Sequence, residues 1–134
     1  MTIDELHKLW DSKSEPPRRR YEDHEHKLQV ECVRWFRIQY PQHLIYAIPN
    51  GGQRNAIVAA KLKAEGVLAG IPDLHIPVAR NGYHGLYIEM KNGKEGRVSQ
   101  YQKETMSILE REGFKCIVCR DLYSFVNEVK HYIG

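Results

Sequence analysis

The chain lacks any apolar run long enough to cross a membrane, and its first residues do not form a secretory signal pattern. It also has no glycine-rich nucleotide-binding fingerprint and no nucleophile elbow. These absences disfavour dehydrogenases, phosphotransferases and serine hydrolases. We therefore expect a cytoplasmic protein that binds neither a membrane nor a nucleotide cofactor.

Cysteine is scarce, with three in 134 residues. Cys116 and Cys119 form a Cys-x-x-Cys pair, a spacing found in zinc and redox sites. The pair lies in a strand-like run, however, where positions three apart face opposite sides of a sheet, and no second ligand pair follows. We therefore expect buried thiols at these positions.

The composition is mildly basic, with 20 Lys and Arg against 17 Asp and Glu and a formal net charge of +3. This charge permits nucleic-acid binding without demanding it. The length predicts one domain with a real core, over residues 21–134, preceded by an arm with a short helix over residues 1–20. The arm ends in the basic run Arg18-Arg19-Arg20, which is either solvated or in contact with phosphate.

Helix and strand signals are interleaved along the chain. Helices are predicted over residues 3–10, 21–39 and 55–65, for about fourteen residues after Ser99, and after Asp121. Strands are predicted over residues 44–48, 73–79, 85–91 and 115–119, with Asn81-Gly82 as a turn between the second and third. This mixed order predicts an α/β fold with a central mixed β-sheet flanked by helices on both faces.

Two acids and a lysine occupy the second and third predicted strands. Asp73 begins one strand, and in the next a single residue separates Glu89 from Lys91. Because strand side chains alternate, Glu89 and Lys91 face one side while their apolar neighbours face a core. Two carboxylates and a lysine suit a hard divalent cation and an activated water, as in phosphodiester hydrolysis. A surface ion pair between Glu89 and Lys91 is the simpler alternative, but it leaves Asp73 unexplained.

The first long helix contributes a third acid. Its apolar stripe has helical spacing and consists of Leu28, Cys32 and Phe36. Glu25 lies on the N-terminal extension of this stripe, where a carboxylate is costly unless it is paired or ligated. Glu25 is therefore a candidate ligand, with a partly exposed helix end as the alternative. His75 shares a strand face with Asp73, where we expect it to pack or to support a metal ligand rather than to bind a metal directly.

Basic and glycine-rich segments flank these acids. The glycines between Asn50 and Arg54 let a backbone approach a phosphate that the arginine can bind, although a simple turn also explains them. Further positive charge lies on the second predicted helix and in the loop after Lys91. The candidate DNA-binding residues are Asn50, Gly51, Arg54, Lys61, Lys63 and Arg97.

Taken in order, these segments resemble the PD-(D/E)XK nuclease superfamily and, within it, the VRR-NUC branch. The matching residues extend over residues 25–119. They are Glu25 with Gln29, Pro49-Asn50-Gly51-Gly52 with Arg54, Gly66 to Asp73, Gly85 to Lys91, and Ser99 with Gln102. Each piece is common by itself, and the ordered set carries the resemblance.

The resemblance implies a restriction endonuclease-like core and a metal-dependent DNA endonuclease that leaves a 5′-phosphate. Asp73, Glu89 and the backbone carbonyl of Met90 would bind one or two Mg²⁺ or Mn²⁺ ions, with Glu25 completing the shell directly or through water. Lys91 would orient or help deprotonate the attacking water. Gln102 would lie beside the active site, although a capping box with Ser99 explains it without chemistry.

The lack of a base-reading motif and the resemblance together lead to expectations for the substrate and the partners. No helix-turn-helix or zinc finger for base readout is evident, so we expect structure-selective cleavage of branched DNA such as four-way junctions. The resemblance implies a small bacterial or phage enzyme, and a homodimer would place two sites on two strands. The alternatives are a non-catalytic nucleic-acid-binding module with this fold, or a nicking subunit of a restriction or repair complex.

Overall fold

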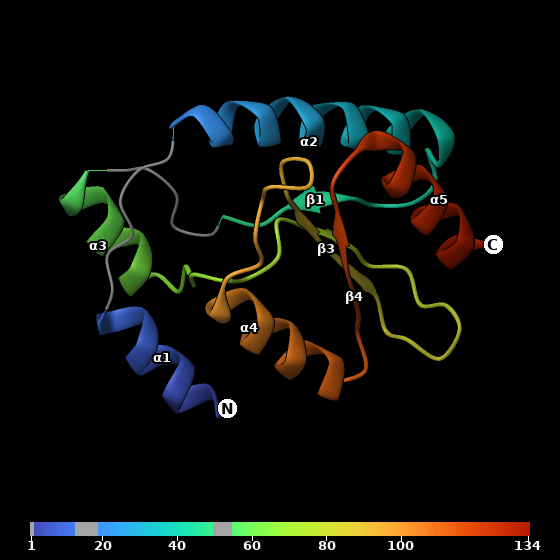
Figure 1. Ribbon diagram of the computed structural model, residues 1–134. Coiled ribbons are helices and arrows are strands. Elements are labelled where there is room, and N and C mark those ends of the chain that lie inside the picture. Colours follow the sequence, from blue (N-terminus) through green and yellow to red (C-terminus); the bar gives the residue numbers. More distant parts are fainter. Residues whose placement is uncertain (1, 13–18, 50–54) are drawn as a thin grey trace.

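A computed structural model shows a mixed sheet with helices on both faces (Figure 1). It describes residues 2–12, 19–49 and 55–134. The helices in these ranges are α1 (Ile3–Ser12), α2 (Arg19–Gln39), α3 (Ala56–Ala64), α4 (Gln100–Arg111) and α5 (Leu122–Ile133). The strands are β1 (Tyr46–Ala47), β2 (Leu74–Ile76), β3 (Leu86–Met90) and β4 (Lys115–Cys119). The predicted fold class is therefore confirmed.

The spatial order of the sheet follows the chain, β1-β2-β3-β4. The first two pairings are antiparallel and β3–β4 is parallel, with α4 as the crossover. Asn81 and Gly82 form the predicted turn before β3, and their φ angles of 54° and 84° are both positive, as the tight hairpin turn of type I′ requires. Among the residues described, none of the helices has the length and apolar character of a membrane-spanning segment.

The core lies between the sheet and the layer formed by α2 and α5. Alternate residues of β2 and β3 are fully buried on this side: Leu74, Ile76, Leu86, Ile88 and Met90. The predicted stripe of α2 is confirmed, because Cys32 and Phe36 are fully buried and Leu28 packs against the same core. The other face of the sheet is covered by α4, against which α1 packs (Figure 1). That second face carries the polar side chains.

Several predicted boundaries shift for local reasons. The strand predicted over 44–48 shrinks to Tyr46–Ala47, which pairs on one side only, with β2. The strand predicted over 73–79 ends at Ile76 because Pro77 follows and cannot donate to the ladder. α2 begins two residues early, at Arg19. The side chains of the basic run Arg18-Arg19-Arg20 lie outside what the structure describes.

The cysteines are free thiols, as expected. Cys32 and Cys119 are buried and Cys116 is half-buried. Burial raises the pKa of each thiol to about 12. Cys116 and Cys119 are therefore packing residues of β4.

Candidate functional site

Asp73 and Glu89 face each other on the side of the sheet away from the core. The β2–β3 register pairs Leu74 with Ile88, so Asp73, one residue before β2, lies across from Glu89. The alternation that buries Leu74 and Ile88 turns both carboxyl groups to the opposite side. Asp73 is held there by its Oδ2 atom, which accepts a hydrogen bond of 2.7 Å from the backbone N–H of Met90.

Glu89 is a buried acid with incomplete hydrogen bonding. Only 2% of its surface is exposed. Its Oε1 atom accepts a hydrogen bond of 2.9 Å from Nε2 of Gln102 and lies 3.8 Å from Nζ of Lys91. Its Oε2 atom is buried without a hydrogen-bond partner among the residues described. An oxygen in this state is costly unless something fills its coordination.

The electrostatics of Glu89 follow from this placement. Burial raises its pKa far above the ordinary value, and the negative charge of Asp73 and a side-chain hydrogen bond with Asp73 raise it further. Lys91 opposes the shift without cancelling it, and the charge of Glu25 adds to it. In the absence of a cation, Glu89 therefore holds a proton at neutral pH.

The donor set fits a hard divalent cation. A buried carboxylate oxygen without a partner, beside a second carboxylate, offers the oxygen ligands that Mg²⁺ and Mn²⁺ prefer. No group of three His, Cys, Asp or Glu side chains in the described ranges could hold a metal by itself. A cation bound here would therefore need backbone and water oxygens as well, which is usual for Mg²⁺.

Gln102 makes two contacts, one in the helix cap and one with Glu89, and the sequence left room for both. Gln102 completes the capping box of α4. Its Oε1 atom accepts a hydrogen bond from the backbone N–H of Ser99 at 2.8 Å, and its backbone N–H donates to Oγ of Ser99 at 3.2 Å. The remaining amide group, Nε2, donates to Glu89. The start of α4 thus fixes the orientation of the buried carboxylate.

Glu25 and Lys91 approach the pair from two further directions. Glu25 is half-buried on α2, close enough for its charge to act on Glu89. Lys91 is buried just beyond β3, and its backbone N–H donates to the carbonyl of Cys119 at 3.0 Å, extending the parallel ladder. The structure therefore brings Glu25, Asp73, Glu89 and Lys91 to one region.

Gly70 lets the segment before Asp73 pass close to α4. Its φ is +85°, and a Cβ atom at this position would lie 2.8 Å from the backbone carbonyl of Tyr101 in α4. The segment before Asp73 therefore passes directly against the first turn of α4, which carries Gln102. This close approach joins the two elements that hold Asp73 and orient Glu89.

Arg120 holds the loop after Lys91, a role that was not predicted from the sequence. Its Nη1 atom donates to the carbonyl of Gly93 at 2.7 Å and to that of Gly96. Carbonyl groups have no sequence signature, so a lone arginine after the last strand offered no signal. Arg97 is exposed in the same loop.

The other predicted DNA-binding residues divide into two groups. Asn50, Gly51 and Arg54 lie outside the described residues. On α3, Lys61 is exposed and Lys63 half-buried.

His75 is a packing residue, as expected. It is buried, with its ring stacked on Tyr87 at 4.1 Å and its Nδ1 atom 2.5 Å from the hydroxyl of Tyr46. Burial lowers its pKa, which favours the neutral ring. This aromatic group supports the sheet face on which Asp73 and Glu89 lie.

The family profile and the two solved structures that match the chain carry the same domain description. The profile of a family described as the VRR-NUC domain matches residues 14–121. A solved structure described as a "VRR_NUC domain protein" is 30% identical, with a TM-score of 0.68 over 82% of this chain and 88% of that one. A second, described as "VRR_NUC domain", is 16% identical with a TM-score of 0.55 over 81% of this chain and 96% of that one, and it supports the fold alone. No curated protein matches the chain.

Proposed function

Because the chain belongs to the VRR-NUC family of the restriction endonuclease-like superfamily, we propose that it is a metal-dependent DNA endonuclease that hydrolyses phosphodiester bonds. One observation carries the proposal. The buried carboxyl group of Glu89 has an oxygen without a partner, lies across from Asp73 and is 3.8 Å from the ammonium group of Lys91. A purely structural role would not require this costly combination.

The chain's own residues would divide the work. When bound, Mg²⁺ or Mn²⁺ supplies Lewis-acid polarisation of the phosphate and lowers the pKa of a water. Asp73 and Glu89 hold it, and Gln102 keeps Glu89 from rotating away. Lys91 orients the attacking water and stabilises the negative charge that develops on the phosphate.

Two further ligands complete the proposed site. Glu25 completes the shell directly or through water, and its charge acts on Glu89. Contact through water is favoured, because no three acidic side chains in the described ranges are placed to hold one metal together. The backbone carbonyl of Met90 follows Glu89 and supplies an uncharged oxygen. All of these donors are oxygen atoms, which favours Mg²⁺ or Mn²⁺ over metals that prefer nitrogen or sulfur.

The proposed substrate is branched DNA, such as a four-way junction, and the proposed active form is a homodimer. No cluster that could build a zinc finger lies within the described part of the chain, and the sequence has no helix-turn-helix signature. Selectivity for shape rather than for sequence is consistent with this lack of a base-reading element. Two-fold symmetry would present one site to each of two strands.

Cleavage of labelled linear, flapped and four-way-junction DNA, with Mg²⁺, Mn²⁺ or EDTA, tests the proposal. We expect metal-dependent cleavage of branched substrates and its loss in Asp73→Asn and Lys91→Ala. Lys130→Ala, which removes an exposed cation of α5, is the matched control and should cleave normally. Equal cleavage of every substrate contradicts structure selectivity, and full activity in Asp73→Asn contradicts the site. Tight junction binding without cleavage would favour a binding module instead.

A further inference from the structure

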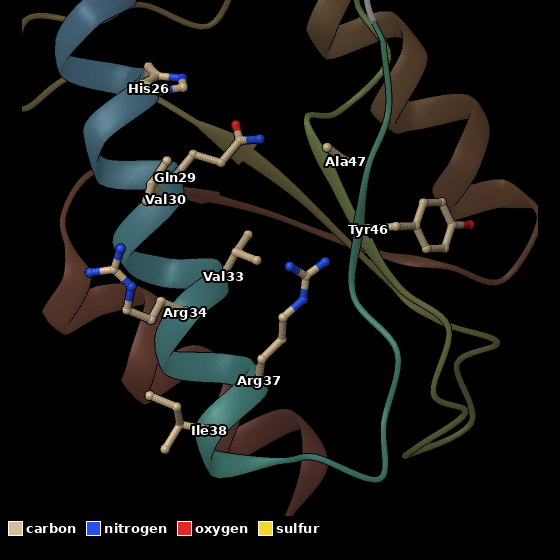
Figure 2. A pocket seen from close by; sticks show the side chains of 9 residues that line it. All are labelled: His26, Gln29, Val30, Val33, Arg34, Arg37, Ile38, Tyr46 and Ala47. Atoms are coloured by element: carbon tan, nitrogen blue, oxygen red, sulfur yellow. The ribbon is translucent and has the colours of Figure 1, made fainter.

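A groove separates α2 from the edge strand β1, and the core and the site described above leave it unexplained. Its volume is about 600 Å³. In Figure 2, Gln29, Val33 and Arg37 project from α2 toward β1, while Arg34 and Ile38 point to the side of α2 that faces away from β1. We call this the α2–β1 groove.

The groove is formed by a second stripe of α2, next to the buried one. Its residues recur at helical spacing from His26 to Ile38, so they share one face of the helix. That face mixes arginines with aliphatic side chains, and it is not covered: Val30 is 41% exposed and Ile38 75% exposed. An apolar stripe that only supported the core would be buried.

The groove is also positively charged. Arg34 and Arg37 are exposed, and neither has an ion pair or a hydrogen bond within the part of the chain that the structure describes. Among the described residues, no acidic side chain lines the groove. Two cations without counter-ions, on either side of apolar contacts, complement an anionic ligand with apolar parts.

One end of the groove lies next to Glu25, a candidate site residue on the same helix. His26 lines this end and follows Glu25, whose charge acts on Glu89. The opposite end, at Ile38, lies thirteen residues beyond Glu25 along α2. With a rise of 1.5 Å per residue, this distance is about 20 Å.

We propose that the α2–β1 groove binds one strand of nucleic acid that leads to the Asp73–Glu89 site; this inference rests on the proposed function. Phosphates meet Arg34 and Arg37, and bases contact the neighbouring aliphatic side chains; the positive charge follows the strand's backbone, as it does in sequence-tolerant single-strand grooves. A volume of about 600 Å³ falls in the range that holds small molecules, so the groove accepts one strand and not a duplex.

Salt-dependent binding tests the inference. The protein is titrated, in EDTA so that nothing is cut, against a fluorescent single strand and against the same sequence as a blunt duplex. Each phosphate contact to a single strand contributes about 0.7 to the slope of log K against log salt. Arg34→Gln/Arg37→Gln should lower the single-strand slope by about 1.4 and weaken binding by about ten-fold. Arg34→Lys/Arg37→Lys keeps the charges and should retain most of the slope.

The matched control is Lys8→Gln/Lys130→Gln, which removes two exposed cations outside the groove. Its single-strand slope should stay within error of the wild type. Equal slopes in Arg34→Gln/Arg37→Gln and in the Lys8→Gln/Lys130→Gln control would overturn the inference. A larger loss of affinity for the duplex than for the single strand would overturn it too. Analytical sedimentation adds a further check. If the wild type is a dimer and Arg34→Gln/Arg37→Gln is a monomer, the groove is a protein interface and the inference is overturned. Thermal melts confirm that each variant is folded.

Cross-linking gives a positional test. Ile38→Cys places an accessible thiol at the far end of the groove, where a photoreactive aryl azide can be attached. About 20 Å corresponds to about six stacked nucleotides at 3.4 Å each. The cross-link should therefore map about six nucleotides from the cleaved phosphate, and a position on the duplex arm would contradict the inference. If the arginine variant loses the slope but wild-type protein with Mg²⁺ cuts no substrate, the inference stands and the proposed nuclease activity fails.

Discussion

Gln102 binds the buried carboxylate of Glu89 with the same side chain that caps α4, so helix capping and site geometry depend on one residue. Ser99→Ala removes the hydroxyl cap but leaves the amide of Gln102, and it should lower the free energy of unfolding by about 1 kcal/mol. Gln102→Ala should cost a similar amount and also lower kcat about ten-fold, because Glu89 loses its orienting bond. Urea unfolding and cleavage kinetics measure both. An equal loss of kcat in the two variants would assign the effect to the helix cap alone.

The pKa of Glu89 predicts an unusual dependence of stability on pH. A carboxyl group whose pKa is raised by folding stabilises the protein below its unfolded pKa, and this contribution is lost as pH rises toward the folded value. Glu89→Gln should therefore make the metal-free protein more stable at pH 8, by on the order of a few kcal/mol, with the difference vanishing below about pH 4.5. Thermal melts across this range in EDTA measure it. A lower melting temperature for Glu89→Gln at pH 8 would contradict the placement of the acid.

Divalent cations should offset the loss of stability that Glu89 causes at pH 8. Binding to the native state stabilises it by mass action, so Mg²⁺ or Mn²⁺ should raise the melting temperature of the wild type at pH 8. Glu89→Gln should show little response, because an amide does not replace the carboxylate ligand. Chelation with EDTA should return the wild type to its metal-free value. An identical shift in both proteins would place the cation elsewhere.

Gly70 and Gly66 form a matched pair for testing the close approach to α4. Both have positive φ, but only a Cβ on Gly70 would meet other atoms, 2.8 Å from the backbone of Tyr101. Gly70→Ala should lower the free energy of unfolding by about 3 kcal/mol, from backbone strain and overpacking together. Gly66→Ala should lose only the backbone part, about 1 kcal/mol. Equal losses would show that the contact with Tyr101 is not limiting.

Arg120 predicts an effect on the loop beside the site. Arg120→Gln removes the donor to the carbonyls of Gly93 and Gly96, so amide hydrogens over residues 92–96 should exchange faster with solvent. We expect kcat to fall about ten-fold, because Lys91 begins this loop. Lys130→Gln is the control for loss of a positive charge. Unchanged exchange in the loop of Arg120→Gln would mean that other contacts hold it.

Local signals predicted much of this architecture. Ser99 and Asp121 cap helices where the sequence predicted caps, and β4 spans the predicted residues. These features depend on neighbours within a few residues, which a sequence displays directly. The alternation of side chains along a strand also predicted that Glu89 and Lys91 share a face.

Tertiary contacts account for what could not be predicted. The approach of Gly70 to Tyr101 joins segments far apart in the chain, and Arg120 binds carbonyl groups that any residue could supply. The α2–β1 groove exists because β1 is only two residues long and lies at the sheet edge. A helical period alone indicates which face of α2 is apolar, but not that a second stripe would be left uncovered.

The antiparallel register of β2 and β3 has a consequence for the fidelity of folding. Asp73 and Glu89 oppose each other only when Leu74 pairs with Ile88. A slip of one residue would turn Asp73 into the apolar layer and leave Glu89 without its counterpart. The paired acids therefore exist only in a chain whose sheet has formed correctly, so a nascent or misassembled copy has no complete site.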